Sequence, residues 1–137
     1  MDISIENPQG SVRSGTAPDG TRWENRIAHH YGYIKGSRGA DNDQIDVFLT
    51  DGAEEATVAW VIDQKNDDGS FDEHKAVIGP KTEDEARAAY LANYDAGWDG
   101  IGAITSMPME AFRAWALDGK RKRRPLANSE QIGRAHV

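Results

Sequence analysis

The sequence predicts an α+β domain in which strands form a small barrel and helices follow later in the chain. Apolar, β-branched runs at short spacing, separated by glycine-containing turns, fill the first half, and helix signals appear only after residue 80. The length of 137 residues corresponds to one domain with a modest core. An apolar content of 38% and a charged content of 28% are typical of a soluble globular protein.

The N-terminal part is predicted to consist of strands. Residues 2–6 alternate in polarity and are expected to begin a strand. Pro18-Asp19-Gly20 is a turn signal, because proline presets φ and glycine accepts a left-handed angle. We therefore expect a hairpin between a strand near residues 11–16 and one near residues 21–27.

The middle of the chain continues the strand pattern. Residues 45–50 and 57–62 are apolar and β-branched, so both are predicted strands. Residues 66–69, with the letters NDDG, predict a second turn, and residues 73–78 are expected to form the returning strand.

Two helices are expected after this strand. Thr82 is a good N-cap, and Glu85 three residues later completes the pattern of a capping box. A second helix is predicted for residues 108–117, with a proline in its first turn and Gly119 just past its end. The glycine-rich residues 97–102 lack the lysine of a P-loop and are interpreted as a loop.

Charge is distributed unevenly along the chain. The net charge is −7, with an acidic body over residues 1–117 and a basic run at residues 120–124. The acidic body argues against non-specific nucleic-acid binding, which depends on Lys and Arg contacts with phosphate. The basic run is interpreted as a solvated tail, with contact to nucleic acid or an acidic partner as the alternative.

Composition also restricts the compartment and the chemistry. The absence of cysteine excludes disulfides, zinc-thiolate sites and thiol catalysis. No apolar run approaches the ~18 residues that a membrane span needs, and no signal peptide is visible. We therefore expect a cytoplasmic protein without membrane partners; its oligomeric state cannot be read from the sequence.

Three aspartates within six residues are the strongest functional signal. Asp41, Asp43 and Asp46 precede an apolar run, and carboxylates this close repel one another unless cations neutralise them. Mg²⁺ takes oxygen ligands and suits such a cluster. The alternative is a solvated acidic loop leading into a strand.

The residues around these aspartates resemble a known family. YGYI at residues 31–34, then a glycine-containing loop and Asp-x-Asp-x-x-Asp, resembles the signature of soluble family I inorganic pyrophosphatases, although Gln44 departs from it. The chain is also similar to a pyrophosphatase-like domain of phage and mobile-element proteins. The shared segments are IENPQGSVRSG, FDEHK, EARAAYLANY and GAIT, within residues 3–117.

This resemblance implies a fold, a boundary and a reaction. The implied fold is a five-stranded, OB-like barrel with helices packed outside. The implied domain is residues 1–119, followed by a basic tail at 120–137; its last residues, 131–137 (QIGRAHV), look like a translated sequencing adapter and are predicted to be artefactual. The implied reaction is Mg²⁺-dependent hydrolysis of pyrophosphate by metal-activated water, with Mn²⁺ as the alternative cation.

The resemblance also assigns roles to the acidic residues. Asp41 and Asp46 match metal ligands, and Asp43 matches the general base. In the second acidic segment, Glu73 falls on a metal-ligand position, which Asp72 could take instead. Asp63 is the expected further ligand there, in competition with Asp67. Glu6 resembles the first acidic site residue of the family.

The expected substrate-binding residues are those that match phosphate-binding positions of the family: Arg13, Arg26, Tyr31, Lys75 and Tyr94. Arg22 competes with Arg26 for one of these positions. Two departures stand out, since the resemblance leads us to expect glutamate at Gly15 and lysine at Asp95. These departures favour an altered substrate or a lost activity.

Two further functions therefore stay open beside pyrophosphate hydrolysis. One is a non-catalytic diphosphate- or metal-binding module of a phage or mobile-element protein. The other is hydrolysis of a nucleotide diphosphate linkage. His29, His30 and His74 are expected to be structural or exposed, with transition-metal binding as the alternative. The four tryptophans are expected to fill core and loop contacts: Trp23, Trp60, Trp98 and Trp115.

Overall fold

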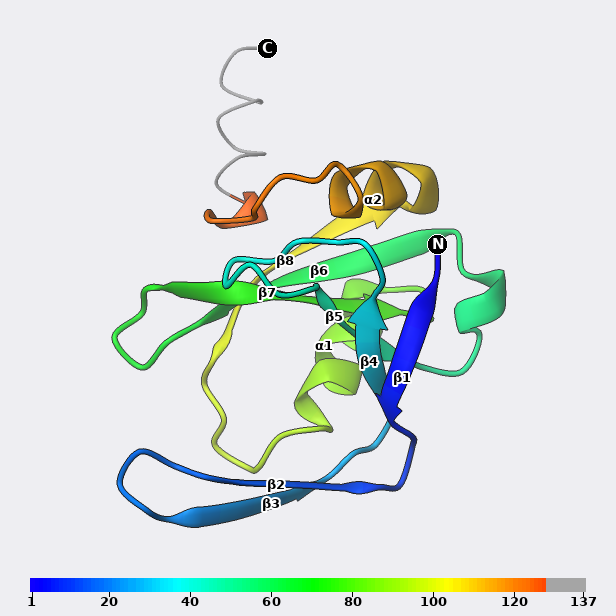
Figure 1. Ribbon diagram of the computed structural model, residues 1–137. Helices are drawn as coiled ribbons and strands as arrows, with labels where there is room; N and C mark the ends of the chain where they lie inside the picture. Colours follow the sequence, from blue (N-terminus) through cyan, green and yellow to red (C-terminus); the bar gives the residue numbers. More distant parts are fainter. Residues whose placement is uncertain (128–137) are drawn as a thin grey trace.

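The computed structural model describes residues 1–127, which form one six-stranded sheet, one two-stranded ribbon and two α-helices (Figure 1). The strands are β1 (Ile3–Asn7), β2 (Val12–Thr16), β3 (Arg22–Arg26), β4 (His30–Ile34), β5 (Asp46–Leu49), β6 (Val58–Lys65), β7 (Phe71–Ile78) and β8 (Ile101–Pro108). The helices are α1 (Glu83–Leu91), α2 (Met109–Ala116) and a short 3-10 helix, η1 (Ala53–Glu55).

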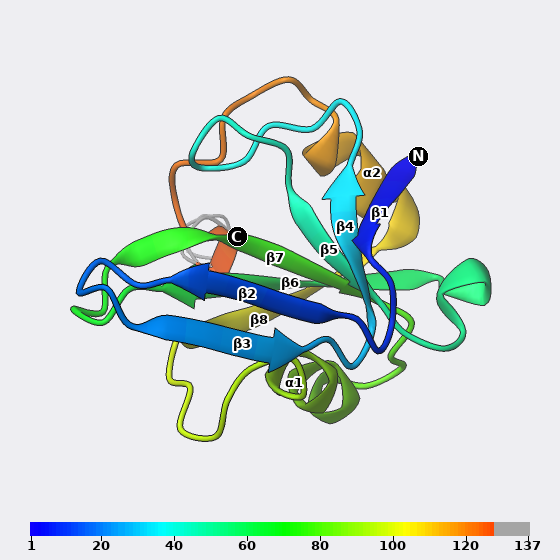
Figure 2. The ribbon, with the colours of Figure 1, turned by 60° about the horizontal axis from the view of Figure 1, so that its bottom comes forward.

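The large sheet is mixed and open. Its strand order is β1-β4-β5-β7-β6-β8; β5 and β7 are parallel, and the other neighbours are antiparallel. The β2–β3 ribbon lies across the sheet as a separate element (Figure 2). The α+β class is confirmed. In residues 1–127 no pairing joins β1 to β8, so the five-stranded closed barrel is not confirmed.

The predicted hairpin is confirmed and shows why its turn residues were informative. The Thr21 amide donates to Asp19 Oδ1 at 2.8 Å, and the Gly20 amide donates to the Ala17 carbonyl at 2.8 Å. Gly20 has a φ of 89°, which glycine adopts without steric cost. The turn therefore fixes the register of β2 against β3.

The two helices cover opposite faces of the sheet. Thr82 caps α1, because its Oγ1 accepts the Glu85 amide at 3.2 Å, as predicted. One core, under α1, contains Phe48, Ile62, Val77 and Tyr90. The other core, under α2, contains Val47, Val61, Ala76 and Phe112. Neighbouring residues of β5, β6 and β7 thus alternate between the two cores, as the two-residue period of a strand requires.

The structure adds a strand where a loop was expected. β8 begins at Ile101 and pairs along β6, so the end of the predicted loop at residues 97–102 is strand. Gly102 makes the pairing possible, because a Cβ there would lie 2.2 Å from the Asp63 carbonyl oxygen. A glycine in this setting signals close backbone approach as well as flexibility.

Four residues of the basic run are exposed, as the interpretation of a solvated tail expects, but Lys122 packs against the protein. Lys122 is 7% exposed, its Nζ lies 2.6 Å from Asp118 Oδ1, and it sits over the Trp115 ring. The Leu126 and Ala127 amides bond to the body of the protein. The boundary at residue 119 remains a prediction, and the expected artefact at 131–137 lies outside the described residues.

Within residues 1–127, no helix has the length and hydropathy that crossing a membrane would require.

Candidate functional site

A buried lysine lies at the centre of the candidate site. Lys75 Nζ lies 2.6 Å from Asp46 Oδ2, 2.8 Å from Glu73 Oε1 and 2.8 Å from the Tyr31 hydroxyl oxygen. The Tyr31 hydroxyl also donates to Asp46 Oδ2 at 2.7 Å. The parallel pairing of β5 and β7 sets Asp46 directly beside Lys75. The strands thus unite four residues that the sequence separates.

The electrostatics of this cluster depend on burial and on the carboxylates. Burial opposes the ammonium charge of Lys75, but Tyr31 and Asp46, then Tyr94 and Glu73, hold its pKa well above the usual value. Burial raises the pKa of Glu73 against the opposing effect of Lys75. Burial also raises the pKa of Tyr31 to about 12. At neutral pH, Lys75 is therefore a charged donor next to Asp46.

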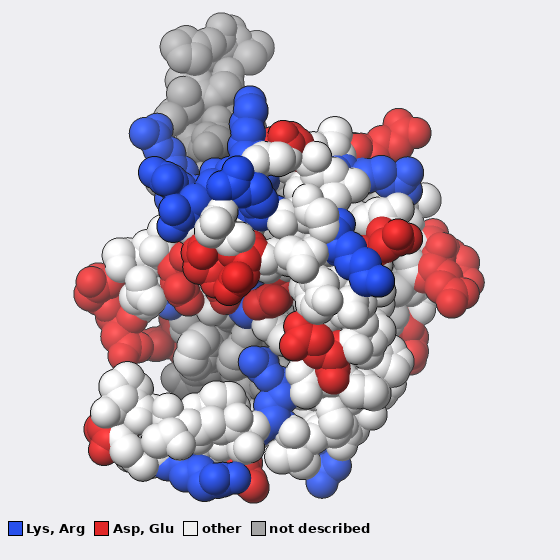
Figure 3. All heavy atoms as spheres, viewed as in Figure 1, with Lys and Arg blue, Asp and Glu red and all other residues white. Residues whose placement is uncertain are grey.

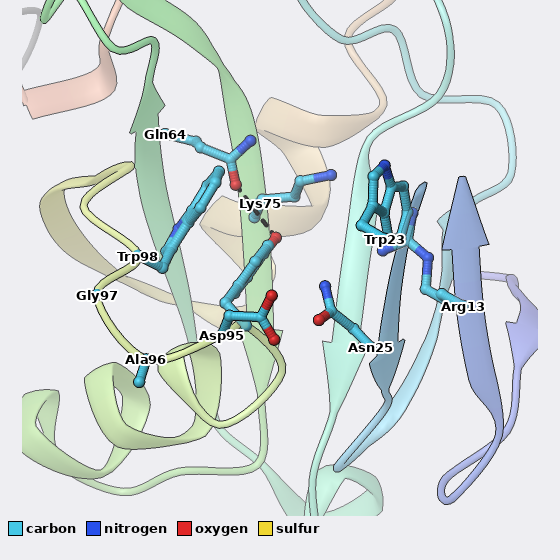
Figure 4. Close-up of a pocket in the computed structure, with 10 residues that line it drawn as sticks. Arg13, Trp23, Asn25, Gln64, Lys75, Asp95, Ala96, Gly97 and Trp98 are labelled. Atoms are coloured by element: carbon cyan, nitrogen blue, oxygen red, sulfur yellow. Dashed lines mark hydrogen bonds between the residues drawn. The ribbon is translucent and has the colours of Figure 1, made fainter. Parts of the chain in front are cut away.

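Lys75 opens onto a cleft of about 500 Å³ (Figure 4). The cleft lies between the β2–β3 ribbon and the sheet, and the segment after α1 closes one side. Its lining includes Arg13, Trp23 and Asn25 from the ribbon, Gln64 and Lys75 from the sheet, and residues 94–98. Figure 3 shows this opening and the acidic side chains gathered on the side away from the ribbon.

The ribbon presents one face to the cleft, and this decides which arginine can take part. Arg13 is paired with Asn25, so both share the cleft-lining face. The Arg13 guanidinium carbon lies 4.4 Å from the centre of the Tyr31 ring. Arg26 is on the other face, where its Nη1 donates to the Gly10 carbonyl at 2.6 Å. The structure therefore does not bring Arg26 to the cleft, because one residue of register reverses its direction.

A glutamine that the sequence did not single out organises the other wall. Gln64 Oε1 accepts the Tyr90 hydroxyl at 2.6 Å and the Tyr94 hydroxyl at 3.2 Å. Gln64 Nε2 donates to Asp72 Oδ2 at 3.0 Å. The pairing of Gln64 with Glu73 across β6 and β7 places it on the face of Lys75. Strand alternation from Ile62 is the signal that could have identified it.

Asp63, an expected metal ligand, lies on the opposite face of the sheet. Its Oδ1 accepts the Leu126 amide at 3.0 Å, and its Oδ2 accepts the Ala127 amide at 3.1 Å. His74 Nε2 lies 3.1 Å from Asp63 Oδ1. Because it faces away from Lys75 and both oxygens are already used, we no longer assign Asp63 to the ligand set.

The remaining acids of the expected site are not among the residues that line the cleft. Asp41 and Asp43 are exposed in the loop before β5, and Asp41 Oδ1 accepts the Asp43 amide at 3.0 Å. Arg38 steadies this loop through Asn42 Oδ1, at 2.6 Å from Nη2. Glu6 is exposed at the bulge between β1 and β4.

The acidic residues of the site fit a divalent cation only in part. In residues 1–127, no three acidic or histidine side chains are placed to share one ion. The donor chemistry nevertheless fits, since Asp46 and Glu73 are partly buried carboxylates held together by a single ammonium group. A cation there would share or replace the contacts that Lys75 now makes.

Comparison with known proteins gives three findings. A family model described as inorganic pyrophosphatase matches residues 1–117. Among solved structures, the chain is similar to an inorganic pyrophosphatase from Coxiella burnetii, with 14% sequence identity and a TM-score of 0.46. That match covers 85% of this chain and 90% of the other chain. No curated protein matches the sequence.

Proposed function

Because the chain belongs to the inorganic pyrophosphatase family, we propose that it hydrolyses pyrophosphate, or a closely related diphosphate, to release phosphate. The observation that carries this proposal is the Lys75 cluster. A charged ammonium group, two carboxylates and a tyrosine hydroxyl meet at one end of a cleft that Arg13 also lines. Such a set can hold a polyanion and the cation that accompanies it.

In this proposal, cationic and hydroxyl groups hold the phosphoryl oxygens. Lys75 and Arg13 supply the positive charge, and an arginine can bind phosphate through two parallel donors. Tyr94, which lines the cleft, and Tyr31, whose hydroxyl contacts Lys75, would add hydroxyl donors. The ammonium group of Lys75 would then exchange a carboxylate contact for a phosphoryl oxygen.

The acidic residues are proposed to hold Mg²⁺, with Mn²⁺ as the alternative. Asp41, Asp46 and Glu73 would be the ligands, and Glu6 would contribute at the periphery. When bound, such a cation neutralises phosphoryl charge and makes a coordinated water more acidic.

Asp43 is proposed to act as the general base. Its exposed carboxylate lies in the loop that Arg38 steadies, so it is accessible to water. The water oxygen would form a bond to one phosphorus atom while its proton passes to Asp43. The bond from that phosphorus to the bridging oxygen breaks, and the second phosphate leaves with the bridging oxygen.

A phosphate-release assay on pyrophosphate, with Mg²⁺ and with a chelator, tests the proposal. We expect Mg²⁺-dependent release by the wild type and a fall of about 10²–10⁴-fold in Asp43→Asn, the typical effect of removing a general base. Asp84→Asn, in the exposed first turn of α1, is the matched control and should retain activity. An Asp43→Asn protein as active as the wild type would remove Asp43 from this role.

A second candidate is a non-catalytic module that binds diphosphate and metal. Two departures favour it: Gly15 and Asp95 stand where the resemblance leads us to expect glutamate and lysine. If calorimetry detects Mg²⁺-dependent binding of pyrophosphate while the wild type releases no phosphate, this second function replaces hydrolysis.

A further inference from the structure

The cleft beside Lys75 is larger and more aromatic than an inorganic diphosphate requires. Its volume of about 500 Å³ falls in the ~300–1000 Å³ range of pockets that bury ligands of drug size. Trp23 and Trp98 line it and remain 37% and 38% exposed. They stand on opposite sides of the cleft, with Lys75 between them (Figure 4). Large exposed rings in a cleft are typical of a binding surface.

Each tryptophan is held in place by its surroundings. A Cβ on Gly15 would lie 2.5 Å from Trp23 Cζ2, and a Cβ on Gly100 would lie 2.4 Å from Trp98 Cζ2. The absence of a side chain at both glycines therefore lets the rings pack against backbone. Trp98 also stacks on Tyr94, with ring centres 4.7 Å apart and planes at 9°. Its Nε1 donates to the Tyr90 hydroxyl at 3.0 Å.

The departures at Gly15 and Asp95 both affect this cleft. Gly15, at the position of an expected glutamate, leaves room for the Trp23 ring. Asp95, at the position of an expected lysine, lines the cleft opposite Asn25. In the amide orientation that satisfies its neighbours, Asn25 donates to Asp95 Oδ1 at 2.7 Å. The cleft therefore has the exposed Trp23 ring and the hydrogen-bonded pair of Asn25 and Asp95. The resemblance leads us to expect a metal-binding glutamate and a phosphate-binding lysine at Gly15 and Asp95 instead.

We propose that this cleft binds a nucleoside diphosphate or triphosphate, an inference that rests on the proposed diphosphate chemistry at Lys75. The phosphates lie toward Lys75 and Arg13, and the base stacks against the aromatic walls formed by Trp23 and Trp98. Every nucleobase has a π-face, so this stacking needs no particular base. Asn25 and Asp95 offer an amide and a carboxylate to base amino groups or ribose hydroxyls.

The joining of these two chemistries in one cleft is what favours a nucleotide. Isolated tryptophans would accept any flat apolar group, and isolated cations would accept any phosphate. Arg13 and Gly15 are two residues apart on β2 and therefore share one face of the ribbon. Trp23 is paired with Gly15, so its side chain lies on the same face as Arg13. A ligand that contacts both must carry a phosphate a short distance from an aromatic ring.

Calorimetric titration of the full chain with ADP, and separately with pyrophosphate, tests this inference. Both titrations are run with a chelator and again with Mg²⁺. Trp98→Ala should weaken ADP binding by about 5- to 150-fold, the range expected for loss of one base-stacking contact. Its effect on pyrophosphate should be smaller. Trp98→Phe keeps a ring without the indole N–H and should recover most of the ADP affinity.

Trp115→Phe is the matched control, because Trp115 packs beside His74 and Phe112 on the other face of the sheet. It should bind ADP like the wild type. If Trp98→Ala does not fold, Trp23→Ala on the exposed ribbon is the second variant and should show the same preferential loss. Equal losses for ADP and pyrophosphate in these variants, or no loss for ADP, would overturn the nucleotide site.

A parallel phosphate-release assay separates this inference from the proposed function. Pyrophosphate hydrolysis together with ADP binding no tighter than pyrophosphate binding would remove the nucleotide site and leave the hydrolase. Tryptophan-dependent ADP binding without phosphate release from pyrophosphate or ADP would leave the nucleotide site and remove the hydrolase.

Discussion

The two faces of the β6–β7 strand pair carry similar residues for different purposes. On the cleft face, Gln64 and Lys75 line an opening to solvent, and Glu73 pairs with Lys75. On the other face, Asp63 and His74 lie under the C-terminal segment and are buried. These residues are neighbours in sequence, and the two-residue period of a strand alone separates them. An acid's position in the strand, more than its charge, therefore decides what it can do.

The two faces also differ in how their polar groups are satisfied. Both oxygens of Asp63 accept hydrogen bonds from backbone amides more than 60 positions away in the chain. These contacts leave the Asp63 carboxylate buried. Asp46 and Glu73 instead share one ammonium group at the edge of a cleft. Asp46 and Glu73 could exchange their contact with the Lys75 ammonium group for contact with a bound metal ion. Asp63 could do so only by breaking its hydrogen bonds with two backbone amides. Substitutions on the two faces should therefore have different effects.

The largest effect is expected from removing the cation of the cleft face. Lys75→Met should lower phosphate release by about 10²–10³-fold, the usual cost of losing one donor that stabilises developing negative charge. Steady-state assays well below the unfolding temperature measure it. Lys65→Met, at the exposed end of β6, is the control. Similar losses in the two variants would mean that Lys75 has no special role.

The next largest effect is expected on the face of the β6–β7 pair opposite the cleft, where a substitution should lower the free energy of unfolding. Asp63→Ala removes the acceptor of two backbone amides, so we expect the free energy of unfolding to fall by about 3 kcal/mol. Urea denaturation measures this change, with Asp67→Ala in the exposed turn as the control. At denaturant concentrations below its unfolding transition, the Asp63 variant should show the same Mg²⁺ dependence of phosphate release as the wild type. An altered Mg²⁺ dependence would return Asp63 to the metal site.

Mg²⁺ should stabilise the protein only through the cleft face. A ligand that binds the folded state alone adds about 2.7 kcal/mol at a hundredfold excess over its Kd. Urea denaturation at matched ionic strength, with Mg²⁺ or with a chelator, should show this increase in the wild type and in Asp63→Asn. Glu73→Gln should show a reduced increase. Identical increases in both variants would contradict the assignment of Glu73 as a ligand.

The smallest effect should appear in alkali. The pKa of Tyr31 is raised to about 12 in the folded protein, above the ordinary value of 10 in the unfolded chain. Between these values the folded state holds the proton more tightly, so the stability that Tyr31 contributes is complete below pH 10 and is lost as the pH rises toward 12. The free energy of unfolding, measured with denaturant across this pH range, should fall less steeply with pH in Tyr31→Phe than in the wild type. Equal slopes would show that Tyr31 does not titrate there.

Local signals in the sequence were sufficient for the hairpin and the first helix. Gly20 and Asp19 make the turn through contacts within a few residues, and Thr82 caps its own helix. These features were predictable because the groups that satisfy them lie close in the chain. The Lys75 cluster was reached through the family resemblance, which carried long-range information that periodicity lacks.

Features that depend on register across strands were not predictable in the same way. Gly102 resembled a loop residue, yet its missing side chain lets β8 approach Asp63. Asp63 and Arg26 were expected in the site, although one residue of alternation turns each away from it. Trp23 and Trp98 were assigned to core and loop contacts, because nothing local shows that two distant tryptophans line one cleft.

The contacts of residues 118–127 have a practical consequence for choosing where to cut the gene. The family match ends at residue 117, which invites expression of a shorter fragment. Arg38 Nη1 donates to the Gly119 carbonyl, and Arg121 Nε donates to the Ala40 carbonyl, so this segment braces the acidic loop from outside. The amides of Leu126 and Ala127 donate hydrogen bonds to the two carboxylate oxygens of Asp63. A fragment intended for biochemistry should therefore extend through residue 127, ten residues beyond the boundary that the family match suggests.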